Sequence, residues 1–141
     1  MADNPQSPPL RGRPLSPHLS IYKWPITMAT SITHRATGVA ISMGIILVAW
    51  GLLALASGPE LYQPFIAAIA SPVGLVILAG FLWSLIYHFL NGIRHLAWDL
   101  GYGFEVSTAS RSGVTVIALS VLLALAVLGY AWWALHGGVR R

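Results

Sequence analysis

The stretch Tyr87-His88-Phe89-Leu90-Asn91-Gly92-Ile93-Arg94-His95-Leu96-Ala97-Trp98-Asp99 closes a long apolar run with a histidine, then a glycine one turn later, then a cluster of charge. Positions i, i+4 and i+7 lie on one face of a helix, so His88, Gly92 and His95 should share a face. An imidazole inside a membrane needs a partner, because an unpaired polar group is unfavourable in hydrocarbon. The stretch therefore predicts a membrane-crossing helix with a ligand or an interhelical bond at His88.

The composition is that of a membrane protein. Of 141 residues, 56% are hydrophobic and only 9% are charged, and the mean hydropathy is +0.71, far from the balance of a soluble domain. Three intervals contain no Asp, Glu, Lys or Arg: residues 36–59, 61–93 and 112–139. Each is long enough for the roughly 20 apolar residues with which a helix crosses a bilayer core. We expect an all-α integral membrane protein with three transmembrane helices.

We expect the spans at about 26–56, 72–98 and 114–135, in an anchor domain of residues 26–141. Residues 1–25, rich in proline and polar residues, are predicted to be a cytoplasmic tail and interfacial segment. Residues 1–20 have no apolar core of the length found in a cleaved signal. The chain has no cysteine, which excludes an iron–sulfur cluster or a thioether-linked haem held by this chain alone.

Cations indicate the orientation. Because positive charge favours the cytoplasmic side of a span, the amino terminus should be cytoplasmic and the carboxyl terminus periplasmic. The basic residues lie at span ends rather than in a solvated patch, so we expect no nucleic-acid partner. Six fall on the predicted cytoplasmic side, Arg11, Arg13, Lys23, Arg35, Arg94 and Arg111, against Arg140 and Arg141 on the other.

Polar side chains gather at the start of the first span. Ser31 and Arg35 are one helical turn apart, and His34 shares a face with Ser31. A hydroxyl and a guanidinium at a membrane surface could hold a quinone carbonyl and stabilise negative charge as the quinone is reduced. The structural alternatives are that Ser31 bonds back to a helix carbonyl and that Arg35 is an ordinary cytoplasmic anchor.

Small residues precede and follow His88. Gly80, Ser84, His88 and Gly92 recur every four residues and should form a groove with room for a flat ligand. Haem iron accepts a neutral imidazole, and a porphyrin would fill such a groove and present two propionates to cations at the surface. The alternative is an interhelical hydrogen bond from His88. The predicted propionate contacts are His34, Arg35, Arg94 and His95.

A single deep histidine leaves a six-coordinate haem without its second axial ligand. The haem would then be five-coordinate or shared with another chain, and three helices bury such a cofactor poorly. We expect a partner subunit with its own spans, so that this chain is part of a heteromeric helix bundle around the haem. Asp99 is expected to pair with His95, four residues before it.

Two motifs give the chain a family resemblance. The first runs from Arg13-Pro14-Leu15 through Ser31-Ile32-Thr33-His34-Arg35-Ala36-Thr37-Gly38, and the second from His88 to Gly101. With these motifs the chain resembles the cytochrome b membrane-anchor subunits of succinate dehydrogenase, the succinate:quinone oxidoreductase of the bacterial inner membrane. The likeness extends from Arg13 into the third span, in order and spacing.

The resemblance implies that His88 is an axial ligand of haem b and that a second anchor subunit donates the other. It also implies that Ser31 and Arg35 help form a ubiquinone site beside an iron–sulfur subunit, with Trp24, Pro25 and Ile32 lining it. The complex of this family contains a flavoprotein that oxidises succinate. The chain itself would then be a subunit of an enzyme without a dicarboxylate or flavin site of its own.

Three other readings stay open. A cytochrome b subunit of a hydrogenase or formate dehydrogenase would need several deep histidines, and this chain offers one. A channel or transporter subunit predicts ionisable residues within the spans, whereas the third span has none before His136. A purely structural scaffold would give a colourless complex.

Overall fold

The computed structural model describes residues 23–138, and the part of the chain that it describes is helical, without strands. Three helices are long and apolar enough to cross a membrane: α1 (Ile26–Ala56), α3 (Pro72–Asp99) and α4 (Val106–Trp133), which continues through a π-helical turn, η1 (Ala134–Gly138). The expected all-α architecture with three long apolar helices is confirmed. Most of the predicted tail, residues 1–22, lies outside the described residues.

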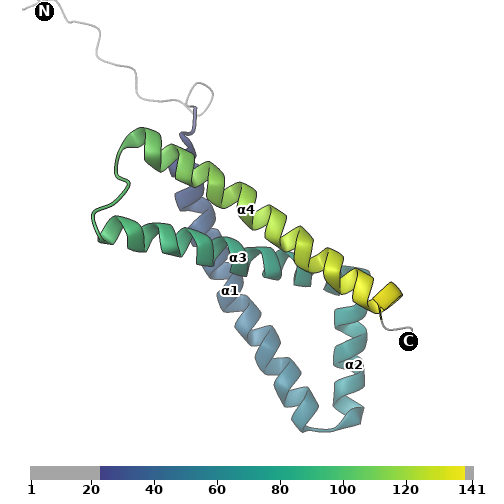
Figure 1. The fold of residues 1–141 in the computed structure, drawn as a ribbon. Coiled ribbons are helices and arrows are strands. Elements are labelled where there is room, and N and C mark those ends of the chain that lie inside the picture. The colour runs from purple at the N-terminus through teal and green to yellow at the C-terminus, as the bar shows by residue number, and fades with distance from the viewer. Residues whose placement is uncertain (1–22, 139–141) are drawn as a thin grey trace, which may run out of the picture.

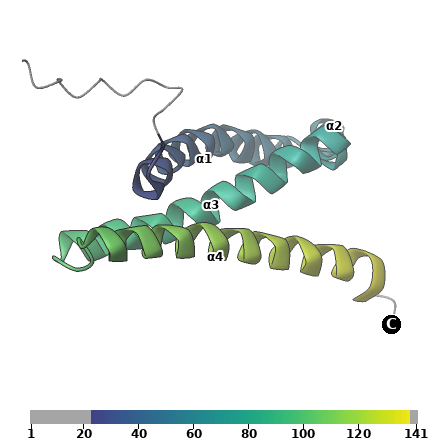
Figure 2. The same ribbon diagram turned by 90° about the horizontal axis from the view of Figure 1, so that it is seen from above.

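The helices form a small open bundle. α3 and α4 pack antiparallel, α1 crosses α3 at a steep angle, and the short α2 (Pro59–Ala70) connects α1 to α3 (Figures 1 and 2). The boundary between α2 and α3 follows from Ser71-Pro72. The Ser71 hydroxyl accepts a hydrogen bond from the Gly74 amide at 3.1 Å, and proline tolerates the first helical position.

The last helix begins earlier than the expected span. The third span is expected above to begin at about residue 114, yet α4 begins at Val106, because residues 106–113 pack against the other helices. Ala109 and Gly113 are buried, and a Cβ added at Gly113 would lie 3.3 Å from Thr30 Cγ2 of α1. The remaining return is short, and Gly101 and Gly103 turn the chain there with φ angles of 87° and 80°.

The interior of the bundle is more polar than its surface. Thr30, Asn91 and Ser120 are completely buried, whereas most of the large apolar side chains face outward, as lipid or a partner helix requires. The buried Tyr87 hydroxyl donates to the Thr30 carbonyl at 3.0 Å, and Trp83 Nε1 donates to Ser120 Oγ at 3.2 Å. Hydrogen bonds therefore join the helices where an apolar core would join them in a soluble protein.

Arg94 is the centre of this polar interior. Its side chain is 7% exposed, and it donates to acceptors on all three long helices. Its guanidinium carbon also lies 4.1 Å from the centroid of the Trp98 ring. The hydrogen bonds run to Ser112 Oγ at 2.9 Å, the Ala109 carbonyl at 2.7 Å, Thr30 Oγ1 at 3.3 Å and Asn91 Oδ1 at 3.3 Å.

We predict that Arg94→Met lowers the free energy of unfolding by about 2 kcal/mol, since it leaves several buried acceptors without a donor. Arg94→Lys should recover little of this loss, because an ammonium group lacks the planar fork that reaches three helices. The measurement is detergent-induced unfolding followed by circular dichroism. Arg111→Met, at an exposed position of α4, is the control. Equal stability of the Arg94 and Arg111 variants would show that the buried network does not hold the bundle together.

Candidate functional site

Three histidines form a column where the start of α1 meets the end of α3. His34 of α1 lies between two rings of α3: its ring centroid is 3.8 Å from that of His88 and 4.9 Å from that of His95. The ring planes are nearly parallel, at 12° and 19°. The structure thus brings together three of the residues that the sequence singled out, from helices more than 50 residues apart along the chain.

His88 is held by α1 through one ring nitrogen. Its Nδ1 lies 3.1 Å from the carbonyl oxygen of His34 and 3.2 Å from Thr37 Oγ1. Gly38 brings the α1 backbone close to the same edge of the ring, because a Cβ at this position would be 3.1 Å from His88 Cε1. Nε2 makes no hydrogen bond to the described part of the chain, so it is the nitrogen available to a ligand.

His95 has a different partner from the one expected. Its Nδ1 lies 2.7 Å from the Asn91 carbonyl, and its ring meets the Trp98 ring edge-on, with centroids 5.0 Å apart. Among the described residues no ion pair joins His95 to Asp99, which is exposed, so the expected pair is wrong. A backbone carbonyl one turn earlier is in a fixed position, whereas a solvated carboxylate at the helix end would have to be ordered.

Ser31 and Arg35 lie at the open edge of this site. The Arg35 side chain is exposed, and its Nε donates to the Ser31 carbonyl at 3.4 Å. The Ser31 hydroxyl does not bond back to a helix carbonyl within residues 23–138, unlike the hydroxyls of Thr37 and Ser42 on the same helix. Two polar side chains one turn apart therefore keep donors free for an external acceptor.

The residues expected around these donors lie at the start of the same helix. Pro25 is the amino-terminal cap of α1, and its carbonyl accepts from the amides of Met28 and Ala29. Trp24 and Ile32 are 52% and 37% exposed. This edge is open, as expected for a site that another chain completes.

Arg94 departs from the expected arrangement. The sequence places it at the rim with His34, Arg35 and His95, but its guanidinium points into the bundle and is bonded there to α1, α3 and α4.

Thr37 is a residue that sequence reasoning missed. Its position three residues after His34, with a hydroxyl on the face toward α3, is the signal that could have found it.

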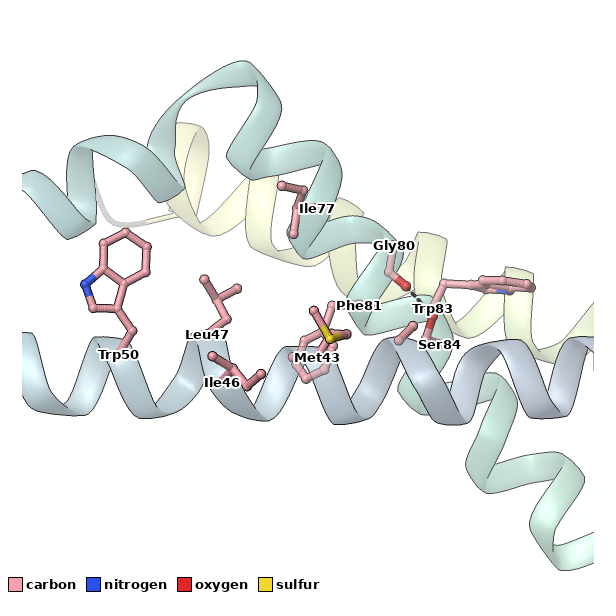
Figure 3. A pocket seen from close by; sticks show the side chains of 11 residues that line it. Met43, Ile46, Leu47, Trp50, Ile77, Gly80, Phe81, Trp83 and Ser84 are labelled. Carbon is pink, nitrogen blue, oxygen red and sulfur yellow. Dashed lines mark hydrogen bonds between the residues drawn. The ribbon is translucent and has the colours of Figure 1, made fainter.

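A cavity of about 720 Å³ lies between α1 and α3 (Figure 3), and one of its lining residues, Ser84, is one turn before His88. Gly80 and Ser84, two members of the expected small-residue groove, contribute to its wall. Its other side chains are apolar or aromatic and none is charged: Ala40, Met43, Gly44, Ile46, Leu47, Trp50, Ile77, Phe81 and Trp83.

The donor set bears on which ligand fits. Residues 23–138 contain no group of three or more His, Cys, Asp or Glu side chains placed to hold a bare metal ion. The site offers one imidazole with a free Nε2, an apolar cavity one turn away and a buried His34 Nδ1 that has no hydrogen-bond partner. These features fit a largely apolar ligand whose metal ion is already coordinated by the ligand itself.

Comparison with known proteins identifies the family. The family model described as succinate dehydrogenase/fumarate reductase transmembrane subunit matches residues 9–127. The succinate dehydrogenase cytochrome b556 subunit of Paracoccus denitrificans is 44% identical over 116 residues, which are 82% of this chain and 89% of that protein. The mitochondrial cytochrome b560 subunit of Mus musculus is 46% identical over 112 residues, 78% of this chain and 66% of that protein. The chain therefore belongs to the family of succinate dehydrogenase/fumarate reductase transmembrane subunits.

Proposed function

We propose that this chain is the cytochrome b anchor subunit of a succinate:ubiquinone oxidoreductase, sharing haem b with a second anchor subunit. The observation that carries the proposal is the His88 ring, which α1 holds by Nδ1 while Nε2 stays free, with an apolar cavity that begins one turn earlier, at Ser84. The names of the similar cytochrome b subunits support it. The remaining partners would be a flavoprotein and an iron–sulfur subunit on the cytoplasmic side of a bacterial inner membrane.

Haem b, when bound, supplies one-electron transfer. In the proposed arrangement His88 Nε2 would hold the haem iron from this chain, and the apolar wall of the cavity would exclude water from the site. His34, Arg35 and His95, which gather where α1 meets the end of α3, would donate to the haem propionates. Arg94, which is also predicted to bind a propionate, would contribute positive charge from inside the bundle, where its guanidinium is bonded to acceptors of this chain.

The quinone site is proposed at the edge formed by Ser31 and Arg35. Their free donors would hold one carbonyl oxygen of ubiquinone and stabilise negative charge on it during reduction by two electrons and two protons. Trp24, Pro25 and Ile32 would contact the ring from the start of α1. This site requires the amino terminus to be cytoplasmic and the carboxyl terminus periplasmic, so that the iron–sulfur subunit can dock beside it.

We predict that His88→Ala abolishes or alters the b-type haem spectrum of the assembled complex, because it removes the ligand nitrogen. The measurement is the reduced-minus-oxidised difference spectrum of the purified complex. His136→Ala, an exposed histidine of η1, serves as the control and should leave the spectrum intact. An unchanged spectrum in fully assembled His88→Ala complex would disprove the ligand assignment.

Ser31→Ala and Arg35→Ala should each lower ubiquinone reduction at least 10-fold, since a hydrogen bond to a developing charge contributes about 1.5–3 kcal/mol. Succinate oxidation by a soluble artificial dye should be largely retained. Ser42→Ala is the matched control, because its exposed hydroxyl lies on the same helix and bonds only to the Gly38 carbonyl, at 3.0 Å. Equal loss of both activities would mean failed assembly and would count against a quinone role.

Gly38→Ala should move the His88 ring by a few tenths of an ångström, since the new Cβ would approach Cε1 to 3.1 Å. We expect a shifted electron paramagnetic resonance signal of the oxidised haem, which reports the orientation of the axial imidazole. Gly129→Ala, at a position with open space around the added Cβ, should leave the signal in place. Identical signals from both variants would refute the close packing of α1 against the ligand ring.

A further inference from the structure

We propose that Thr37 and the His34 carbonyl act together as an acceptor pair for His88 Nδ1, which fixes the imidazole tautomer so that Nε2 carries the free electron pair. Thr37 is then a positioning residue for the axial ligand. The inference rests on the proposed haem-binding function and assigns to α1 a specific part in it. The residues concerned are contributed by this chain alone.

The hydrogen-bonding capacities of the groups support this assignment. The His34 carbonyl oxygen can only accept, and it lies 3.1 Å from His88 Nδ1. An unprotonated Nδ1 would set two electron pairs against each other at that distance. The proton therefore belongs on Nδ1, and a neutral ring then has its free electron pair on Nε2.

The Thr37 hydroxyl completes the pair. Its single proton has two acceptors on α1 itself, the carbonyls of Thr33 and His34, each 2.9 Å from Oγ1. With that proton directed to the α1 backbone, an electron pair of Oγ1 remains for the Nδ1 proton of His88 at 3.2 Å. Thr37 is 3% exposed, so no bulk water competes for the contact.

The surroundings keep the ring in this orientation. The His34 ring is stacked on the His88 ring with centroids 3.8 Å apart, and Gly38 lets the α1 backbone approach the Cε1 edge. A ring flip would remove Nδ1 from both acceptors and place carbon against the His34 carbonyl. The arrangement corresponds to the outer-shell acceptor that orients many metal-ligating histidines and makes the ligand nitrogen more basic.

The test compares Thr37→Val, which keeps the shape and removes the hydroxyl, with Thr37→Ser, which restores it, in the purified complex. Thr37→Val should raise the reduction midpoint of the bound haem, because a less basic imidazole stabilises the oxidised iron less. It should also speed haem transfer to excess apomyoglobin about 10-fold, the lower end of outer-shell effects on metal affinity. Thr37→Ser should return both values toward those of the unmodified complex.

Thr115→Val is the matched control, since the exposed Thr115 hydroxyl also bonds to a carbonyl one turn earlier, at 3.0 Å, and contacts no histidine. The proposal is overturned if Thr37→Val leaves midpoint and haem transfer unchanged, if Thr115→Val changes them equally, or if Thr37→Ser restores neither. Thr37→Ala tests the same hydroxyl should the valine variant assemble poorly. Failure of the haem assignment itself is seen separately, as haem retained in His88→Ala.

Discussion

A guanidinium buried among three helices is the interaction on which the rest of this structure depends. The Arg94 side chain donates to Thr30 of α1, Asn91 of α3 and both Ser112 and the Ala109 carbonyl of α4. Because most large apolar side chains face outward, hydrophobic burial within the chain cannot hold the helices together by itself. The guanidinium supplies directional hydrogen bonds, which specify which helices pack together and at which position along their axes they meet.

The column of His34, His88 and His95 depends on the position along α1 and α3 at which these two helices meet. Thr30, which accepts from Arg94, is one turn before His34, and Asn91, which also accepts from Arg94, is one turn before His95. A shift of α1 along α3 by one turn would remove His34 from its place between His88 and His95 and would break the contact of the His34 carbonyl with His88. The polar network and the candidate haem site therefore form one unit. The hydrogen bonds of Arg94 to Thr30 and Asn91 fix the positions of His34 and His95, one turn further along their helices.

The sequence was sufficient for the helices and for placing His34 and His95 at the same end of the bundle, whereas the stacking of His34 on His88 was not predicted. Charge-free intervals and small-residue spacing carry that information locally. The sequence did not predict that the Arg94 side chain points into the bundle, because arginines at span ends commonly face headgroups. The hydrogen-bond acceptors of Arg94 on α4 are recognised only from the packing of residues 106–113 against the other helices. The same packing explains the early start of α4. The Thr37 contact was missed because it depends on the rotation of α1 against α3.

The length of α4 has a consequence for the buried charge. With η1 the apolar helix covers Val106–Gly137, 32 residues, or about 48 Å at 1.5 Å per residue. A hydrocarbon layer of about 30 Å leaves roughly 9 Å of helix beyond each side. Of the α4 partners of Arg94, Ala109 lies within the first of these two segments, which covers about residues 106–111, and Ser112 lies directly after it. The guanidinium is thus kept near headgroup depth, where a cation is far less unfavourable than at the bilayer centre.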